Sequence, residues 1–326
     1  MWDFLKKFFV LNMLVNTLNR LPPMRTFMMD LIYPEPVRFN HPKDRLAHAD
    51  LGLPEKNIPL ITRGSSSYAV PLNQTTLKVI EPANITPSLV LGAHEINEMR
   101  SLGLAQQQQL IDRKIDKLRR IVRKTTEAMA IQSISGKIEY DIRNADNTMD
   151  TYVVDFGTPQ AIVVTKKWDA AGTTAGDITA SIGQILSSLG ETSEGTDIVF
   201  LCGHDVYSAL VTKAGTLNNA ELIKVFPDHV QIGNAKFIIC SAKYWSYKDK
   251  AFRKAIPEKS VAAIARDDGF SLAYCALDSL DASFASLPFF VRAASLDDPE
   301  AAKLIAQARP MTIPNVDAIR TAVVLT

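Results

Sequence analysis

The stretch LAQQQQLIDRKIDKLRRIVRKTTEAMAIQSI, residues 104–134, has the clearest periodicity in this chain and decides its fold. Neither Gly nor Pro interrupts it before Gly136, and as a helix it would span roughly 45 Å at a rise of about 1.5 Å per residue. Its apolar positions step by seven and then alternately by four and three, which places them on one helix face. These positions are Leu104, Ile111, Ile115, Leu118, Val122, Thr125 and Met129. We therefore predict one long amphipathic helix.

The opposite face of this predicted helix is basic. Asp116 and Arg120 have the i, i+4 spacing of an ion pair, but bases outnumber acids on this face. Charged helix faces are most often solvated surfaces without a specific partner. The alternative interpretation is a basic surface turned toward a polyanion such as DNA, made of Arg113, Lys117, Arg120, Arg123 and Lys124.

Downstream of the helix, the sequence predicts a strand hairpin and then a mixed α/β body. After Gly136 the hydrophobic period changes to two, and residues 144–147 have the composition of a turn. From about residue 160, short β-branched runs alternate with helical periodicity, and one helix ends at Gly190. We predict strands at 138–142, 151–156, 197–202, 236–240, 260–265 and 322–325, and helices at 178–189, 205–213 and 301–308. Prolines 310 and 314 bracket the run 311–313.

Upstream of the helix, the chain has few means of folding on itself. Ten of its 17 prolines fall between Pro22 and Pro87, and proline favours extended, interrupted backbone. Residues 36–80 nevertheless alternate like a long two-stranded excursion, and residues 2–18 have amphipathic helical spacing. Apolar side chains without a core of their own need another surface, and we expect a second copy of the chain to supply it. The predicted intersubunit contacts are Trp2, Phe4, Phe8, Val37, Phe39, Leu51, Ile58, Ile61, Arg63 and Tyr68.

Composition limits the classes of function. The 326 residues are 47% hydrophobic and 22% charged, which is typical of soluble globular proteins. Net charge is +1, so the chain lacks the overall basic field of a dedicated nucleic-acid binder, although a local basic face is compatible with it. The three scattered cysteines have no zinc-site spacing and are predicted to be buried thiols in a reducing compartment. No apolar run is long enough to span a membrane, so we expect no membrane association.

A search for catalytic chemistry finds little. The sequence has no phosphate-binding glycine loop and no zinc-protease or serine-hydrolase motif. His204 and Asp205 follow a predicted strand, where α/β enzymes often place functional groups, but Asp205 also suits the N-cap of the next helix. We therefore predict no catalytic residues, no metal and no cofactor. A cytoplasmic α/β enzyme with an oligomerisation arm remains an alternative that depends on His204.

The order of these segments resembles one family. An N-terminal arm, a long excursion, a long helix, a strand hairpin and an α/β body follow one another as in the major capsid proteins of tailed bacteriophages, which have the Hong Kong-type α+β capsid fold. The details resemble the lambda-type branch, the capsid protein E family. The likeness covers essentially the whole chain and is carried by residues 62–66 (TRGSS), 77–82 (LKVIEP), 84–89 (NITPSL), 308–317 (ARPMTIPNVD) and 322–325 (AVVL).

The resemblance implies a role for each segment. Residues 1–33 would be an N-terminal arm, and residues 34–80 an extended loop over a neighbouring subunit. Residues 81–160 would form a peripheral domain around a spine helix at 104–134. Residues 161–308 would form an axial domain, and residues 309–326 a strand returning to the peripheral domain.

The resemblance also implies a function and partners. The protein would assemble through hexamers and pentamers into the icosahedral shell of the virion, in the host cytoplasm, around non-specifically held double-stranded DNA. Expected partners are a portal protein, a decoration protein and a separate scaffolding protein, because capsid-like sequence begins almost at the first residue. A cellular nanocompartment shell related to encapsulins is a further alternative, since it would share the fold.

Overall fold

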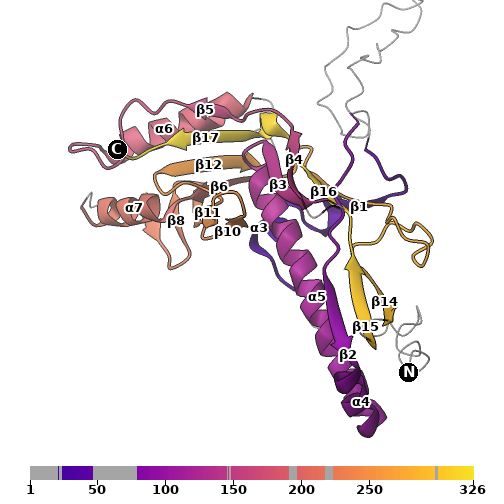
Figure 1. The fold of residues 1–326 in the computed structure, drawn as a ribbon. Coiled ribbons are helices and arrows are strands. Elements are labelled where there is room, and N and C mark those ends of the chain that lie inside the picture. The colour runs from indigo at the N-terminus through magenta and orange to yellow at the C-terminus, as the bar shows by residue number, and fades with distance from the viewer. Residues whose placement is uncertain are drawn as a thin grey trace, which may run out of the picture.

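The computed structural model describes residues 21, 24–46, 79–144, 146, 148–190, 197–216, 223–297 and 300–326. Figure 1 shows a long helix, α5 (Leu104–Ser133), with a seven-stranded sheet at its C-terminal end and a three-stranded sheet along its N-terminal part. Among the described helices, none is long and apolar enough to cross a bilayer.

Helix α5 confirms the predicted long helix, and Ile111, Ile115, Leu118 and Val122 are buried along one face as expected. Two of the predicted buried positions are wrong. Leu104 is 77% exposed, because Gln107 takes the buried place in the first turns and its Nε2 donates to the Leu102 carbonyl at 2.8 Å. Further along, Thr126 is buried in place of Thr125.

The sheet that covers this face of α5 corrects another prediction. Its strand order is β14-β15-β2, and both pairings are antiparallel. Residues 301–308 were predicted to be helical, but they lie almost entirely in β15. Ala302, Leu304 and Ala306 alternate into the α5 interface, where helical spacing would have turned some of them outward. The bounds are β2 (Ser88–Gly92), β14 (Phe290–Asp297) and β15 (Glu300–Gln307), with helix α4 (Ala93–Ser101) between β2 and α5.

The seven-stranded sheet has the order β5-β17-β12-β6-β9-β8-β7, and helices α6 (Ala175–Leu189) and α7 (His204–Thr216) pack on one face. Alternation along β12 divides the core: Val261 and Ala263 face these helices, whereas Ala262 and Ile264 face the end of α5. The predicted strands at 197–202, 236–240 and 260–265 are confirmed. The strand predicted at 322–325 begins three residues earlier and ends two residues earlier, as β17. The bounds are β5 (Gln160–Ile162), β6 (Ile198–Cys202), β7 (Ile223–Val225), β8 (His229–Ile232), β9 (Ala235–Ile239), β12 (Ser260–Ala265) and β17 (Ile319–Val323).

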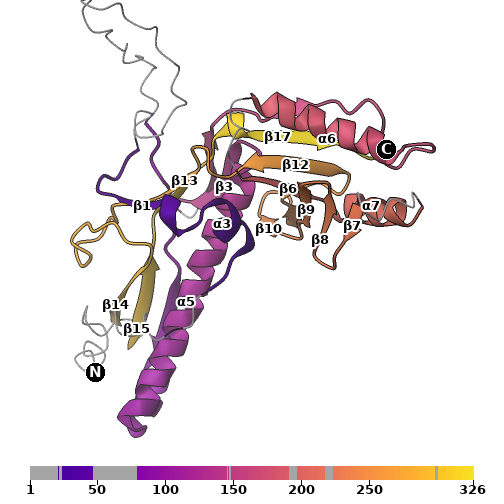
Figure 2. The ribbon, with the colours of Figure 1, turned by 180° about the vertical axis from the view of Figure 1, so that it is seen from behind.

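Three smaller units surround the C-terminal end of α5. The predicted hairpin after Gly136 is confirmed as β3 and β4, and β10 and β11 form a second hairpin. A third unit places β1 parallel to β13, which pairs antiparallel with β16. Figure 2 shows the short helix α3 lying across α5 beside this unit. The bounds are α3 (Phe27–Ile32), β1 (Arg38–His41), β3 (Lys137–Arg143), β4 (Met149–Asp155), β10 (Lys243–Ser246), β11 (Ala251–Lys254), β13 (Ser271–Cys275) and β16 (Pro310–Ile313), with 3-10 helices at Glu35–Val37 and Val316–Ala318.

The packing of these units differs from the segment boundaries expected from the sequence. Strands β14 and β15 belong to the predicted axial segment 161–308, yet they pack along α5. Strand β17 belongs to the predicted return segment 309–326, yet it lies between β5 and β12 in the seven-stranded sheet. Of the predicted excursion at 36–80, the structure describes only the two ends. Eight of the predicted contact residues lie outside the described part of the chain: Trp2, Phe4, Phe8, Leu51, Ile58, Ile61, Arg63 and Tyr68.

Candidate functional site

His204 is the residue on which the enzyme alternative depends, and it lies at the start of a helix. It is exposed at the start of α7, and its backbone N–H donates to Glu258 Oε2 at 2.8 Å. Glu258 therefore caps this helix, and the prediction of Asp205 as its N-cap is wrong, because Asp205 already lies inside the first turn. In the described part of the chain, no group of three or more His, Cys, Asp or Glu side chains is arranged to hold a metal ion.

The three cysteines are buried and free, as predicted. Burial raises the pKa of Cys202 to about 12 and the pKa of Cys240 and Cys275 to about 11. These side chains are therefore neutral thiols that fill the core, and they lack the low pKa of a reactive thiolate.

The exposed face of α5 carries four of the five predicted basic residues, which we call the basic stripe: Arg113, Lys117, Arg120 and Lys124. They recur at helical spacing on the side opposite the buried face. Arg120 Nε lies 2.7 Å from Asp116 Oδ2. Among the described residues, no carboxylate lies within ion-pair distance of the other three. Three of the four charges of the stripe therefore have no acidic partner among the described residues.

Arg123, the fifth predicted residue, has a different role. Its Nη2 lies 2.7 Å from Asp30 Oδ1 in α3, and its Nε donates to Thr26 Oγ1 at 3.1 Å. Arg38 contacts the same Asp30 oxygen at 2.9 Å. Arg123 therefore fixes the N-terminal segment against α5 and is not part of the basic stripe.

Glu127 extends this attachment, which we call the N-terminal clamp (Asp30, Arg38, Arg123 and Glu127). Its two carboxylate oxygens accept the backbone N–H groups of Met28 and Met29 at 2.7 and 2.9 Å, at the open start of α3. Burial raises the pKa of Glu127, although these two donors and Arg123 oppose the shift. A glutamate 98 residues from Met29 thus determines where the N-terminal segment meets the fold.

The predicted excursion, residues 36–80, which we call the extended segment after that prediction, begins beside this clamp. Val37 packs partly on the core, whereas Phe39 on β1 is 37% exposed, so only Phe39 of this pair remains a predicted contact for a neighbour. Leu46 and Ile80 then pair through two backbone hydrogen bonds of 2.9 Å, which brings the two ends of the excursion together. Buried Arg309 braces the returning chain by donating from Nε to the Pro82 carbonyl at 2.9 Å.

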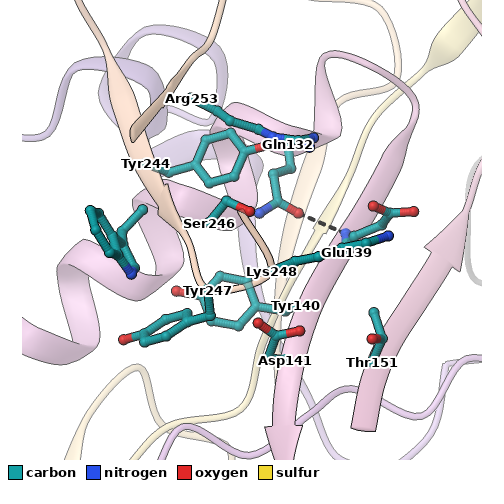
Figure 3. A pocket seen from close by; sticks show the side chains of 11 residues that line it. Gln132, Glu139, Tyr140, Asp141, Thr151, Tyr244, Ser246, Tyr247, Lys248 and Arg253 are labelled. Atoms are coloured by element: carbon teal, nitrogen blue, oxygen red, sulfur yellow. Dashed lines mark hydrogen bonds between the residues drawn. The ribbon is translucent and has the colours of Figure 1, made fainter. Parts of the chain in front are cut away.

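Sequence reasoning missed a hollow between the β3–β4 and β10–β11 hairpins. Figure 3 shows Tyr140 of β3 beside Tyr247, with Lys248 and Arg253 at the rim. Gln132 at the end of α5 accepts the Glu139 backbone N–H at 2.7 Å and so joins α5 to β3. The hollow encloses about 30 Å³, so it has room only for water. The signal for this region was the run KYWSYKDKAFRK at residues 243–254, in which aromatic and basic residues alternate.

Comparisons with known proteins agree with this architecture. A family model described as phage major capsid protein E matches residues 11–324, and no curated protein matches the chain. A crystal structure designated as a prophage capsid protein of E. coli CFT073 is 16% identical, with a TM-score of 0.65 over 96% of this chain and 98% of its own. The capsid of a native GTA particle is 11% identical, with a TM-score of 0.48 over 94% and 93% of the two chains. The predicted α+β capsid fold is confirmed.

Proposed function

Because the chain belongs to the phage major capsid protein E family, we propose that it is the repeating subunit of the icosahedral shell of a tailed-phage head. The observation that carries this proposal is the family match over residues 11–324, which leaves no room for a separate catalytic domain within the matched chain. The same match favours a phage shell over the nanocompartment and enzyme alternatives. In this function the protein acts through the surfaces that contact neighbouring subunits. His204 lies at the start of helix α7, where its backbone N–H donates to Glu258.

Assembly would proceed through hexamers and pentamers in the host cytoplasm. The support lies at the base of the extended segment, where the Leu46–Ile80 pairing holds both ends of residues 47–79 at one point of the fold. The N-terminal clamp fixes the preceding chain on α5 beside it. A segment anchored so closely at its base can reach a neighbour without loosening the subunit that carries it. Phe39, exposed beside this base, is the described residue that we propose for such a contact.

The shell would enclose double-stranded DNA and hold it without sequence preference. The support is the basic stripe, whose four positive charges contrast with a net charge of only +1 for the whole chain. A portal protein, a scaffolding protein and a decoration protein complete the set of partners that we propose for such a head.

The first test is electron microscopy of the purified full-length protein after size-exclusion chromatography. We expect hollow polyhedral shells, or rings that close when a scaffolding protein is added. A small, uniform oligomer that never forms curved sheets under these conditions would contradict the proposed function.

A loop replacement tests the extended segment itself. Replacing residues 48–77 by a short Gly-Ser linker is compatible with the fold, because Leu46 and Ile80 are already hydrogen-bonded neighbours. We expect the variant to keep the thermal stability of the wild-type subunit and to form no shells. Shortening the turn at residues 144–147, between β3 and β4, provides a matched control that should still assemble. Normal shells from the linker variant would remove the extended segment from the assembly interface.

A further inference from the structure

The hairpin of β10 and β11 (residues 243–254) presents an uncovered aromatic face. Trp245 and Phe252 are directly opposite each other, with ring centroids 5.0 Å apart in an edge-to-face arrangement. They are 40% and 60% exposed, although large aromatic side chains are usually well buried. Lys243 shares this face, and its Nζ lies 5.0 Å from the centroid of the Phe252 ring. We call this element the aromatic–basic hairpin.

The hairpin has an excess of positive charge. It contains five basic residues and one acid, Asp249, which lies 2.5 Å from Arg253. Lys254 pairs with Glu258 outside the hairpin. Its other cations are Lys243, Lys248 and Lys250, and among the described residues none of them has a carboxylate within ion-pair distance. The adjacent strand β3 supplies Glu139, which pairs with Lys137 at 2.6 Å, and Asp141 at the rim of the hollow.

The hairpin lies on the same side of the molecule as the basic stripe. Strands β2 and β15 cover the face of α5 that contains Ile115 and Leu118, and the stripe is on the opposite face. Figure 1 shows β10 on the side of α5 away from β2 and β15, near its C-terminal end, and Figure 2 shows it likewise on the side away from β15. The stripe alone covers about 16 Å at a rise of about 1.5 Å per residue. The hairpin therefore prolongs it into one basic track.

We propose that this track, made of the basic stripe and the aromatic–basic hairpin, binds the phosphodiester backbone of nucleic acid without sequence preference. This inference extends the proposed function, in which the shell encloses DNA. Arg120, Arg253 and Lys254 are paired with carboxylates, but the other six cations of the track have none within ion-pair distance among the described residues. Such a row of unpaired cations matches a polyanion in charge and repeat. The aromatic pair holds the Lys243 ammonium in place, and indole N–H groups are donors that suit phosphate oxygens.

The test measures binding of labelled DNA to the full-length, unassembled protein by fluorescence anisotropy, at several salt concentrations near 0.1 M. The variant is Lys248→Ala with Lys250→Ala. The matched control, Lys224→Ala with Lys236→Ala, removes the same charge from exposed positions on β7 and β9. We expect the hairpin variant to lose roughly tenfold in affinity per lysine near 0.1 M salt and to reduce the salt slope by about two. The control should leave the slope unchanged.

A second measurement uses Trp245 as its own reporter. Trp168 is fully buried, so in a Trp2→Phe background, which removes the third tryptophan, DNA that covers the hairpin should quench the exposed indole of Trp245. Trp245→Phe should abolish that change. Duplex and single-stranded DNA are compared side by side, since both offer the same backbone. Tighter binding of the single strand would assign the aromatic face to base stacking, and tighter binding of the duplex would assign the track to the packaged form.

Three outcomes would overturn the inference. The hairpin variant and its control could bind DNA equally, the wild type could fail to bind DNA at low salt, or polyglutamate could displace DNA at equal charge concentration. The last result would identify an acidic protein as the partner. Shell formation is scored by microscopy on the same samples. If the hairpin variant forms shells and binds DNA as tightly as the wild type, only the inference is refuted. If the wild type forms no shells, the proposed function is refuted.

Discussion

The two halves of helix α5 have one continuous periodicity but different surroundings. Over residues 104–122, one face packs on the β14-β15-β2 sheet and the opposite face carries exposed charge. Over residues 123–133, the helix is enclosed by α3, β10, β3 and β16, and seven side chains are buried: Thr126, Ala128, Met129, Ala130, Ile131, Gln132 and Ser133. The first half supports an exposed charged surface, and the second is the junction at which two other parts of the core meet.

We expect the largest difference in stability between the two halves when the glycines that flank the helix are substituted. Gly136, just after the C-terminal end, has φ +77°, and an added Cβ would collide with the Gly157 carbonyl oxygen. Gly136→Ala should lower the free energy of unfolding by about 3 kcal/mol or more, because both strain and a backbone clash are introduced. Urea denaturation of the unassembled protein measures this.

Gly103, at the N-terminal end, is the matched control. It has ordinary backbone geometry, and nothing lies within 4 Å of an added Cβ. Gly103→Ala should change stability by no more than about 1 kcal/mol, the scale of an altered N-cap. Equal losses at the two glycines would show that the helix ends are equally constrained and would break the comparison.

Elements with a strong local period were predictable from the sequence. Helix α5, the β3–β4 hairpin and strands β6 and β12 each bury a face that their own spacing reveals. Residues 301–308 were not, because AAKLIAQA is compatible with a helix in isolation. Pairing with β14 and β2 on both sides, together with the demand of α5 for a flat apolar cover, makes this run a strand.

The functional surface was only partly predictable for a related reason. Helical spacing identified the basic stripe, but it could not show that Arg123 is bound to Asp30, 93 residues away. It also could not show that Glu258 caps α7 in place of Asp205, since that contact spans 54 residues. Periodicity reports the face on which a side chain lies, and only the tertiary structure reports which partner occupies that face.

A smaller loss of stability is expected when Glu127, in the second half of α5, is substituted. Glu127→Ala leaves the N–H groups of Met28 and Met29 without their acceptor, so the free energy of unfolding should fall by about 2 kcal/mol. Asp112 in the first half of α5 is the control, since its half-buried carboxylate accepts from the Gln108 side chain at 2.7 Å and, among the described residues, from no backbone N–H at a helix start. Asp112→Ala should lower stability by about 0.5 kcal/mol or less. Equivalent losses at both acids would contradict the assignment of Glu127 to a clamp.

The same residue predicts a pH dependence with a defined sign. Burial raises the pKa of Glu127 above its ordinary value of 4.5, so the folded state holds this proton more tightly than the unfolded chain. The contribution of Glu127 to stability is therefore fully present below pH 4.5 and decreases as the pH rises through the folded pKa. Glu127→Gln should remove this decrease, which denaturation from pH 4 to 7 would detect. An unchanged pH profile in the variant would contradict the prediction.

The smallest effect is expected at two arginines three residues apart, Arg120 and Arg123. The substitution that lowers stability more should be the one that affects DNA binding less. Arg123→Ala removes the ion pair to Asp30 and should lower the free energy of unfolding by about 1 kcal/mol. Arg120→Ala removes an exposed i, i+4 pair with Asp116 and should lower it by no more than about 0.5 kcal/mol. In DNA binding the order reverses: Arg120→Ala should reduce the salt slope by about one, and Arg123→Ala should leave it unchanged. If both arginines changed both measurements alike, the boundary between the exposed half and the junction would not lie between them.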